Sequence, residues 1–271
     1  AAGEFSPSPP GTEHATIVGM TLRVTGAPFG LATSAGRRRG HNEDAALAGP
    51  DWYVVADGMG GHAAGEIASR LVVETFASIQ PDNAAIVGSI RAACERANTA
   101  VRHRAAHDGT HGMGSTIVGL VPGPHRDPYP DPAEPSRPTG PTLFHVGDSR
   151  CYRLVDGELR LYTRDHSHVQ ELIEAGRLTT AQARRHPLRN VVTRAIGLDR
   201  DVIPEIVRLD PRPSRYLLCT DGLVAEIGPR VIGRVLAGTD SPDAAARRLV
   251  ELAREGEASD DMTALVVDLV E

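Results

Sequence analysis

The chain has 271 residues, and its 35 acidic and 29 basic side chains give a formal net charge of −6. This length is enough to bury a sizeable core, and a hydrophobic fraction of 41% is typical of a globular rather than a disordered protein. The acidic balance argues against a general nucleic-acid-binding protein, because such proteins carry a net basic face. It also argues against a phosphate-bearing substrate, unless cations neutralise the acids locally.

The cysteines and the start of the chain bear on the compartment. Cys94, Cys151 and Cys219 lack the spacing of a metal site, so we expect free thiols in the reducing cytoplasm, with Cys219 a core residue. No apolar run reaches about 18 residues and no signal-peptide pattern opens the chain, so we expect no membrane insertion. We expect residues 1–20 to be a linker or cloning remnant, which leaves open that the chain is part of a longer protein, and residues 21–271 to form one domain.

The first half of the domain combines strands with two amphipathic helices. Strand-like runs occupy residues 22–26 and 52–56, and the second is followed by a glycine-rich loop with the sequence DGMGG. Apolar residues at helical spacing predict a helix over residues 63–79 and another over 82–107, with Asp82 as its N-cap.

The second half is mainly strand-like. Runs rich in β-branched, aromatic or other apolar residues predict strands at 115–121, 142–147, 151–155, 158–162, 216–220 and 263–270. Asp156-Gly157 is a strong signal for a two-residue hairpin turn. In residues 122–141, 8 of 20 residues are proline, which excludes a helix or a central strand and predicts a loop excursion. Helices are predicted over residues 169–175, 179–186 and 242–255.

The order of these elements indicates the fold class. Strands do not alternate regularly with helices, so a doubly wound parallel sheet is disfavoured. Strand pairs joined by hairpin turns, with long helices between them, favour an antiparallel α+β layered arrangement.

Aspartates stand at the ends of four apolar strands, and three of them adjoin glycine: Asp57, Asp148, Asp221 and Asp260. If these carboxylates converge, they repel one another unless a cation lies between them. Oxygen ligands without His or Cys favour Mg²⁺ or Mn²⁺ over Zn²⁺. A single Asp-Gly after a strand is usually a turn, as we expect for Asp156, so the pattern alone leaves a metal site and a set of turns equally open.

Eight short motifs follow one another along the chain: RGHNED from Arg39, VADGMGGH from Val55, GMGST from Gly112, HVGDSR from His145, TRDHS from Thr163, VTRAIG from Val192, LCTDGL from Leu218 and SDDMT from Ser259. In this order they resemble the metal-dependent, type 2C protein serine/threonine phosphatases of bacteria, over about residues 22–269. The resemblance implies a four-layer αββα sandwich, in which two antiparallel sheets are flanked by antiparallel helix pairs.

The resemblance also implies a metal centre of two or three Mn²⁺ or Mg²⁺ ions. Asp57 would bridge two ions, the carbonyl of Gly58 would bind one of them, and Asp148 would bind a third, weaker ion. The full set of implied ligands is Glu43, Asp57, Gly58, Asp148, Asp221 and Asp260.

The implied reaction is direct hydrolysis of phosphoserine or phosphothreonine, in which a hydroxide bridging two ions attacks phosphorus without a phosphoenzyme. Arg39 would grip the phosphate, although a solvated basic run is the alternative and is what we expect of Arg37 and Arg38. Met59 stands where eukaryotic relatives carry a His. His62 is therefore a candidate general acid, and a metal-bound water is the alternative.

Two further segments leave alternatives open. Asp261 stands where the family usually has Asn, and its charge either affects the metal site or faces solvent. Residues 165–190 correspond to a flap beside the active site in bacterial members. Its arginines either meet an acidic phosphopeptide or are simply solvated: Arg177, Arg184, Arg185 and Arg189.

The implied partners are phosphorylated proteins, including a serine/threonine kinase or its targets, and we expect a monomer that does not bind nucleic acid. A catalytically inactive binding member is one alternative. A phosphatase acting on anti-sigma-factor antagonists is another. Against the inactive member, every implied metal-binding acid and Arg39 are present.

Overall fold

The computed structural model describes residues 13–17, 20–24, 26–37, 40–61, 64–123, 140–256 and 259–269. The strands are β1 Glu13–Ile17, β2 Met20–Val24, β3 Phe29–Ser34, β4 Asp44–Ala48, β5 Tyr53–Met59, β6 Gly114–Ser115, β7 Ile117–Val121, β8 Thr142–Val146, β9 Arg150–Val155, β10 Glu158–Leu161, β11 Glu205–Arg208, β12 Ser214–Cys219 and β13 Met262–Leu269. The helices are α1 Ala64–Ala77, α2 Ile86–Asp108, α3 His168–Glu174, α4 Thr180–Ala183, α5 Asp221–Glu226, α6 Pro229–Gly238 and α7 Pro242–Glu255.

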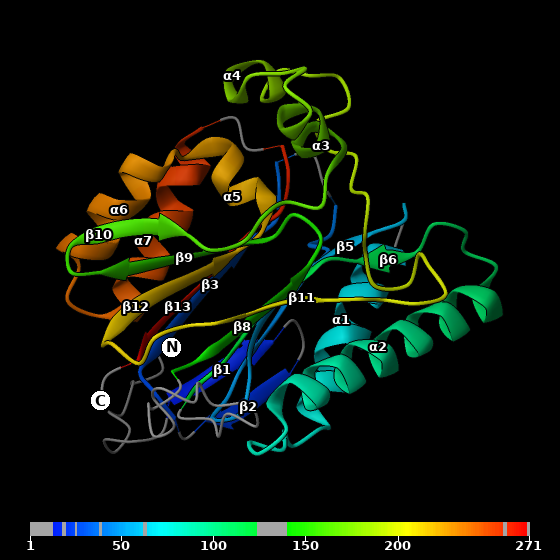
Figure 1. The fold of residues 1–271 in the computed structure, drawn as a ribbon, viewed down its shortest axis with the longest axis horizontal. Helices are drawn as coiled ribbons and strands as arrows, with labels where there is room; N and C mark the ends of the chain where they lie inside the picture. Colours follow the sequence, from blue (N-terminus) through cyan, green and yellow to red (C-terminus); the bar gives the residue numbers. More distant parts are fainter. Residues whose placement is uncertain are drawn as a thin grey trace, which may run out of the picture.

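Two antiparallel sheets stack between two groups of helices (Figure 1). One sheet has the order β11-β8-β7-β5-β4, with β6 added to β5, and the other has the order β10-β9-β12-β13-β3. Three hydrophobic clusters lie between the layers: one under α1 and α2, one between the sheets and one under α6 and α7. Four layers require three such interfaces, so the predicted α+β sandwich is confirmed.

Strand β5 illustrates how the sequence specifies this layering. Trp52, directly before the strand, belongs with Val54 and Ala56 to the cluster under the helices, whereas Tyr53 and Val55 belong to the cluster between the sheets. Successive side chains of a strand point to opposite faces, so a strand buried on both faces is apolar at every position. The strand continues through Asp57 and Gly58 to Met59, three residues beyond the predicted strand that ends at Ala56, where we expected a loop.

Some elements differ from the sequence prediction. Strands β3, β4 and β11 and helices α5 and α6 were not predicted. Asp82 is not the N-cap of α2, since the cap position is Ala85, and the Asp82 carboxylate instead accepts a hydrogen bond from the backbone N–H of Ala84 at 2.9 Å. The predicted hairpin turn is confirmed, with positive φ at Asp156 and Gly157 joining β9 to β10.

Strand β1 lies upstream of the predicted domain start and pairs with β2. The domain boundary near residue 20 stays a prediction. Residues 124–139 of the Pro-rich stretch lie outside the described part of the chain. In the part that is described, no helix combines the length and the apolar character needed to cross a membrane.

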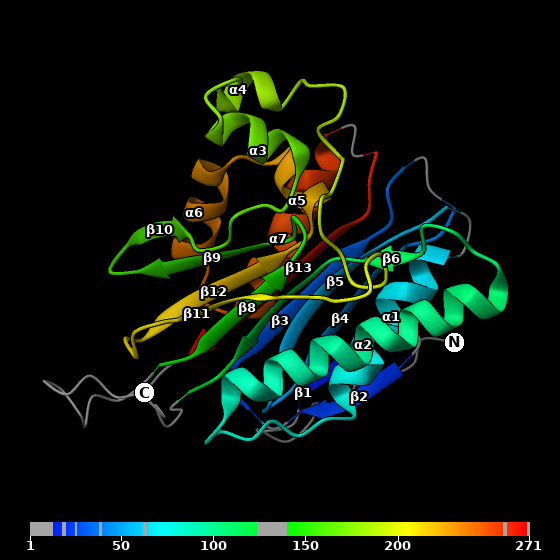
Figure 2. The ribbon, with the colours of Figure 1, turned by 45° about the vertical axis from the view of Figure 1, so that its right-hand side comes forward.

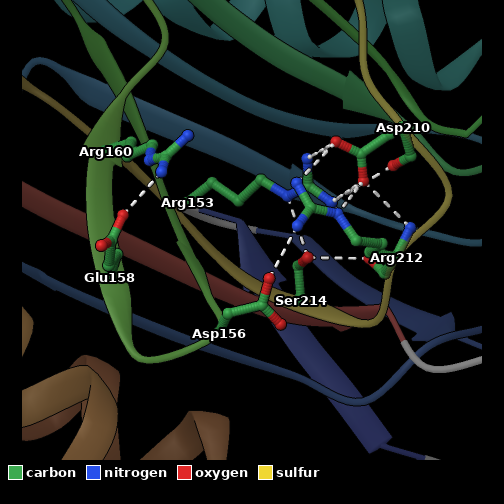
Figure 3. A network of polar contacts seen from close by, with 7 residues as sticks. All are labelled: Arg153, Asp156, Glu158, Arg160, Asp210, Arg212 and Ser214. Atoms are coloured by element: carbon green, nitrogen blue, oxygen red, sulfur yellow. Dashed lines mark hydrogen bonds and ion pairs between the residues drawn. The ribbon is translucent and has the colours of Figure 1, made fainter.

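Strand β9 of the five-stranded sheet carries a fully buried arginine, Arg153 (Figure 3). The Arg153 guanidinium donates to both carboxylate oxygens of Asp210, at 2.8 and 3.0 Å, and to Ser214 Oγ at 2.9 Å. It also donates to the carbonyl oxygens of Asp210 and Arg212. These contacts compensate the desolvation of the charge, because a buried cation is tolerated only when it is paired and hydrogen-bonded.

Candidate metal centre

The acids predicted as metal ligands lie at strand ends that the sheet registers bring to one end of the sandwich. In the six-stranded sheet, Asp44 at the start of β4 is paired with Asp57 near the end of β5, and Glu43 directly precedes Asp44. In the other sheet, Cys219 at the end of β12 is paired with Ala264 near the start of β13. The two flanking acids of that second pair are Asp221 and Asp260.

These residues line a single cavity of about 740 Å³. All six predicted ligands contribute to its wall: Glu43, Asp57, Gly58, Asp148, Asp221 and Asp260. The cavity is also lined by Asn190 and Val192, at the C-terminal end of the predicted flap and just beyond it. Arg39 and His62 lie outside the described residues, whereas His41, which is exposed, lines the cavity.

The carboxylates raise one another's pKa. Burial, followed by the charges of Asp44 and Asp221, raises the pKa of Asp57 well above its ordinary value. Burial and the charge of Asp221 do the same for Asp148. Burial and the charge of Asp260 raise the pKa of Asp221 to about 6. Each carboxylate therefore makes it harder for its neighbours to ionise.

This donor set fits divalent cations. Five acidic side chains converge on the cavity, and none of its described lining residues is Lys or Arg. Protons or bound cations can neutralise the negative charge of such a cluster. Carboxylate and carbonyl oxygens are ligands that Mg²⁺ and Mn²⁺ prefer.

Gly65 in the first turn of α1 is a site residue that the sequence analysis missed. A Cβ at this position would lie 2.7 Å from both Cδ and Oε1 of Glu43. The Glu43 carbonyl accepts a hydrogen bond from the N–H of Gly58 at 3.1 Å. The absence of a side chain at Gly65 therefore lets Glu43 lie against the N-terminus of α1. A glycine inside the first turn of a predicted helix was the signal that could have identified it.

We expect Gly65→Ala to displace the Glu43 carboxylate and to raise the Mn²⁺ concentration needed for half-maximal activity by about tenfold, the lower end of what disturbed supporting contacts cost at metal sites. A Mn²⁺ titration of phosphopeptide hydrolysis measures this. Gly88→Ala in α2 is the matched control, because a Cβ there meets nothing within 4 Å. Equal Mn²⁺ requirements for the two variants would show that Gly65 does not position Glu43.

Asp261 is buried, which contradicts the alternative that it faces solvent. Its Oδ1 accepts a hydrogen bond from the N–H of Gly36 at 2.9 Å, and its Oδ2 accepts one from the N–H of Glu43 at 2.8 Å. Both oxygens thus hold the backbone of the segment that leads to the predicted metal ligand Glu43. These contacts join residues more than 200 positions apart, so no local sequence signal indicates them.

Asp261→Asn retains one acceptor oxygen but turns an NH₂ group toward the other backbone N–H. We expect it to cost about 1–3 kcal/mol, the range for a buried group left unsatisfied, and to raise the Mn²⁺ requirement. Urea denaturation and Mn²⁺ titration measure the two effects, with Asp201→Asn on the exposed surface as control. If both variants behave like the wild type, Asp261 has no such role.

The chain is similar to known proteins over most of its length. Residues 33–265 match the family model described as protein phosphatase 2C. The serine/threonine protein phosphatase PstP of Mycobacterium tuberculosis is 35% identical over 249 residues, which are 90% of this chain and 45% of PstP. The protein phosphatase PhpP of Streptococcus pneumoniae is 30% identical over 253 residues, 89% of this chain and 97% of PhpP. The chain spans just under half the length of PstP.

Solved structures agree with the sequence comparisons. The crystal structure of a PstP catalytic domain in complex with two manganese ions superposes with a TM-score of 0.77 at 32% identity. That match covers 90% of this chain and 98% of the PstP domain. The family model covers far more than half of the chain, and the fold and the sequence relatives agree with it. The chain therefore belongs to the protein phosphatase 2C family.

Proposed function

We propose that this chain hydrolyses phosphoserine and phosphothreonine in proteins, with Mn²⁺ or Mg²⁺ as cofactor. The observation that carries the proposal is the convergence of five acidic side chains on one cavity, at the positions of the family motifs. The family membership and the manganese complex of the similar PstP domain support the same conclusion.

The six cavity residues named above are the proposed ligands of two or three ions. Asp57 is the proposed bridging ligand, and its backbone is held on both sides by Thr116, whose hydroxyl accepts from the Asp57 N–H at 3.2 Å and whose N–H donates to the Asp57 carbonyl at 2.8 Å. When bound, such ions supply an activated water and charge stabilisation for the phosphoryl group. Arg39 is proposed to bind the phosphate and His62 to act as general acid.

The proposed substrates are phosphorylated proteins, including a serine/threonine kinase or its targets. The flap arginines support an acidic phosphopeptide: the four named above are all exposed. Arg184 and Arg189 line a second cavity, of about 500 Å³, that shares Asp148, Asn190 and Asp221 with the first. A bound peptide could extend from one cavity into the other beneath the flap.

The remaining proposals concern the organisation of the protein. We propose one phosphatase domain over residues 21–271, a monomeric state and a cytoplasmic location. The cysteines support a reducing compartment, since Cys94, Cys151 and Cys219 are free and buried. As expected, Cys219 is a core residue, and burial raises the pKa of its thiol to about 12.

The direct test is phosphate release from phosphothreonine, phosphoserine and phosphotyrosine peptides of one sequence, with Mn²⁺ and with EDTA. The proposal predicts turnover of the first two peptides that requires Mn²⁺. A folded chain without Mn²⁺-dependent turnover would contradict the proposal and favour a binding role.

The carboxylate cluster also predicts a pH dependence. Asp44 has a pKa raised to about 8 by burial and Asp221 one raised to about 6, so the folded metal-free protein holds protons that the unfolded chain releases. The stability from these protons is present at low pH and is lost as the pH rises through 6 to 8. Because ligands must be deprotonated to bind metal, we expect the rise in Tm caused by Mn²⁺ to be larger at pH 8 than at pH 6. Thermal denaturation with EDTA or Mn²⁺ tests this, and a pH-independent rise would contradict it.

A further inference from the structure

His166 holds the residue that precedes Asp148 by both of its backbone groups. The N–H of Gly147 donates to Nδ1 of His166 at 3.1 Å, and the backbone N–H of His166 donates to the Gly147 carbonyl at 2.9 Å. Gly147 has φ +110°, and a Cβ there would lie 2.6 Å from Cβ of Thr116. The turn that carries Asp148 therefore depends on a backbone conformation that favours glycine and on two contacts from one histidine.

The hydrogen bonds define the tautomer of this ring. A backbone N–H can only donate, so Nδ1 of His166 is the unprotonated nitrogen and Nε2 carries the proton. Nε2 lies 3.0 Å from Oε1 of Glu205, which accepts that proton's hydrogen bond. By accepting the hydrogen bond from Nε2, Glu205 favours the tautomer in which Nδ1 of His166 is unprotonated. Nδ1 can then accept the hydrogen bond from the N–H of Gly147.

The surroundings of His166 fix its orientation. The side chain of His166 is 1% exposed, and its ring stacks on the buried ring of His145, with centroids 4.7 Å apart and an angle of 22°. One ligand atom each of His145, His166 and Glu205 lies within 4.8 Å of the others, a spacing that a metal ion could use. The proton on Nε2 of His166 uses the lone pair that such an ion would need. The contacts therefore favour a chain of hydrogen bonds from Glu205 through His166 to Gly147 over a metal site.

Contacts of Ser149 and Arg150 also hold the turn that carries Asp148. Arg150, two residues after Asp148, forms a bidentate ion pair with Asp165, the neighbour of His166. The hydroxyl of Ser149 lies 2.7 Å from that of Thr116, which accepts from the Asp57 N–H. The turn between β8 and β9 is thus attached on one side to the start of the flap and on the other to Asp57.

We infer that His166 is a positioning residue, which holds the Asp148 carboxylate in the cavity through Nδ1 and Gly147, with Glu205 selecting the required tautomer. The inference rests on the proposed function, in which Asp148 is a ligand of the third and most weakly bound ion. A carboxylate that is not held in place binds an ion less tightly, since part of the binding free energy is lost in ordering it.

Two substitutions separate the two nitrogens. His166→Asn keeps an acceptor at the δ position, whereas His166→Gln offers a group only at the ε position. Mn²⁺ binding to the 271-residue chain, followed by the EPR signal of free Mn²⁺, measures the effect without turnover. We expect Asp148→Asn to abolish the binding of one Mn²⁺ ion. We expect His166→Gln to weaken the binding of that same ion by about tenfold, as lost supporting contacts do at metal sites. We expect His166→Asn to recover most of that loss.

A second pair of variants at the half-buried Glu205 keeps the test decisive if His166→Gln does not fold. Glu205→Gln retains an acceptor for Nε2 and is expected to bind Mn²⁺ like the wild type, whereas Glu205→Ala is expected to lose affinity. The inference would be overturned if His166→Gln and His166→Asn bound Mn²⁺ with equal affinity and Glu205→Gln and Glu205→Ala did so too. A wild-type chain that binds no Mn²⁺ would instead overturn the proposed function, so the two failures are distinguishable.

Discussion

Asp57→Asn is expected to lower Mn²⁺-dependent hydrolysis of a phosphothreonine peptide by about a thousandfold or more, because metal charge stabilisation supplies several kcal/mol and each 1.4 kcal/mol is about tenfold in rate. Asn has the shape of Asp but lacks the charge that a bridging ligand needs. The fold should persist, since the backbone contacts of Asp57 with Thr116 do not involve its carboxylate. The metal-free variant should even be more stable, because burial and the neighbouring acids disfavour a charge on Asp57, and Asn carries none.

Asp156→Asn is the matched control for this substitution. Asp156 also precedes a glycine, but it belongs to the hairpin turn between β9 and β10 and has φ +52°, a conformation that Asn adopts readily. We expect its turnover to equal that of the wild type. Retention of a tenth or more of the activity by Asp57→Asn would contradict the proposed role of Asp57.

Asp210→Ala is expected to destabilise the fold by about 3–5 kcal/mol, the cost of removing one partner of a buried ion pair. The Arg153 side chain is 0% exposed, and Asp210 accepts three of its hydrogen bonds (Figure 3). The two bonds to the carboxylate are lost in the variant, and the charge of Arg153 remains buried. Urea denaturation measures the difference in the free energy of unfolding.

The exposed pair of Glu158 and Arg160 provides the comparison for that experiment. Their side chains are 67% and 58% exposed, and exposed pairs contribute little because water screens them. We expect no measurable shift of the urea midpoint for Glu158→Ala. Similar midpoints for Asp210→Ala and Glu158→Ala would show that the Arg153 network does not stabilise the protein.

The sequence predicted the elements whose own residues determine them. Strands β5, β8 and β12 each place apolar residues in two of the three hydrophobic clusters, and the long helices have one apolar side. Strands β3 and β4 contain Gly and Ala, which have low strand propensity, and they form because neighbouring layers cover them. Gly30 in β3 shows this, since a Cβ there would lie 2.2 Å from Cα of Asp243 in α7.

Helix α6 had a local signal that the sequence analysis did not use. It starts with Gly228 at the cap and Pro229 in the first turn, an arrangement typical of a helix N-terminus. Its apolar residues also recur at helical spacing: Val231, Ile232, Val235 and Leu236.

The candidate site likewise contains residues that the sequence identifies and residues that it does not. Strand ends next to glycine, together with the motif order, identified the six cavity residues that we propose as ligands. The residues that hold them could not be predicted, because Gly65, Asp261 and His166 act through contacts with distant segments. The net charge of −6 was equally uninformative about the cavity, because it says nothing about how the charges are distributed.

The number of Mn²⁺ ions that the chain takes up, starting from its metal-free form, tests the central claim most directly. The account requires the carboxylate cavity to hold its cofactor. Titration of the 271-residue chain with Mn²⁺, followed by the EPR signal of the free ion, measures this number without any substrate. We expect at least two ions per wild-type chain and fewer in Asp57→Asn. A folded wild-type chain that binds fewer than two ions, or an Asp57→Asn variant that binds as many as the wild type, would contradict the account.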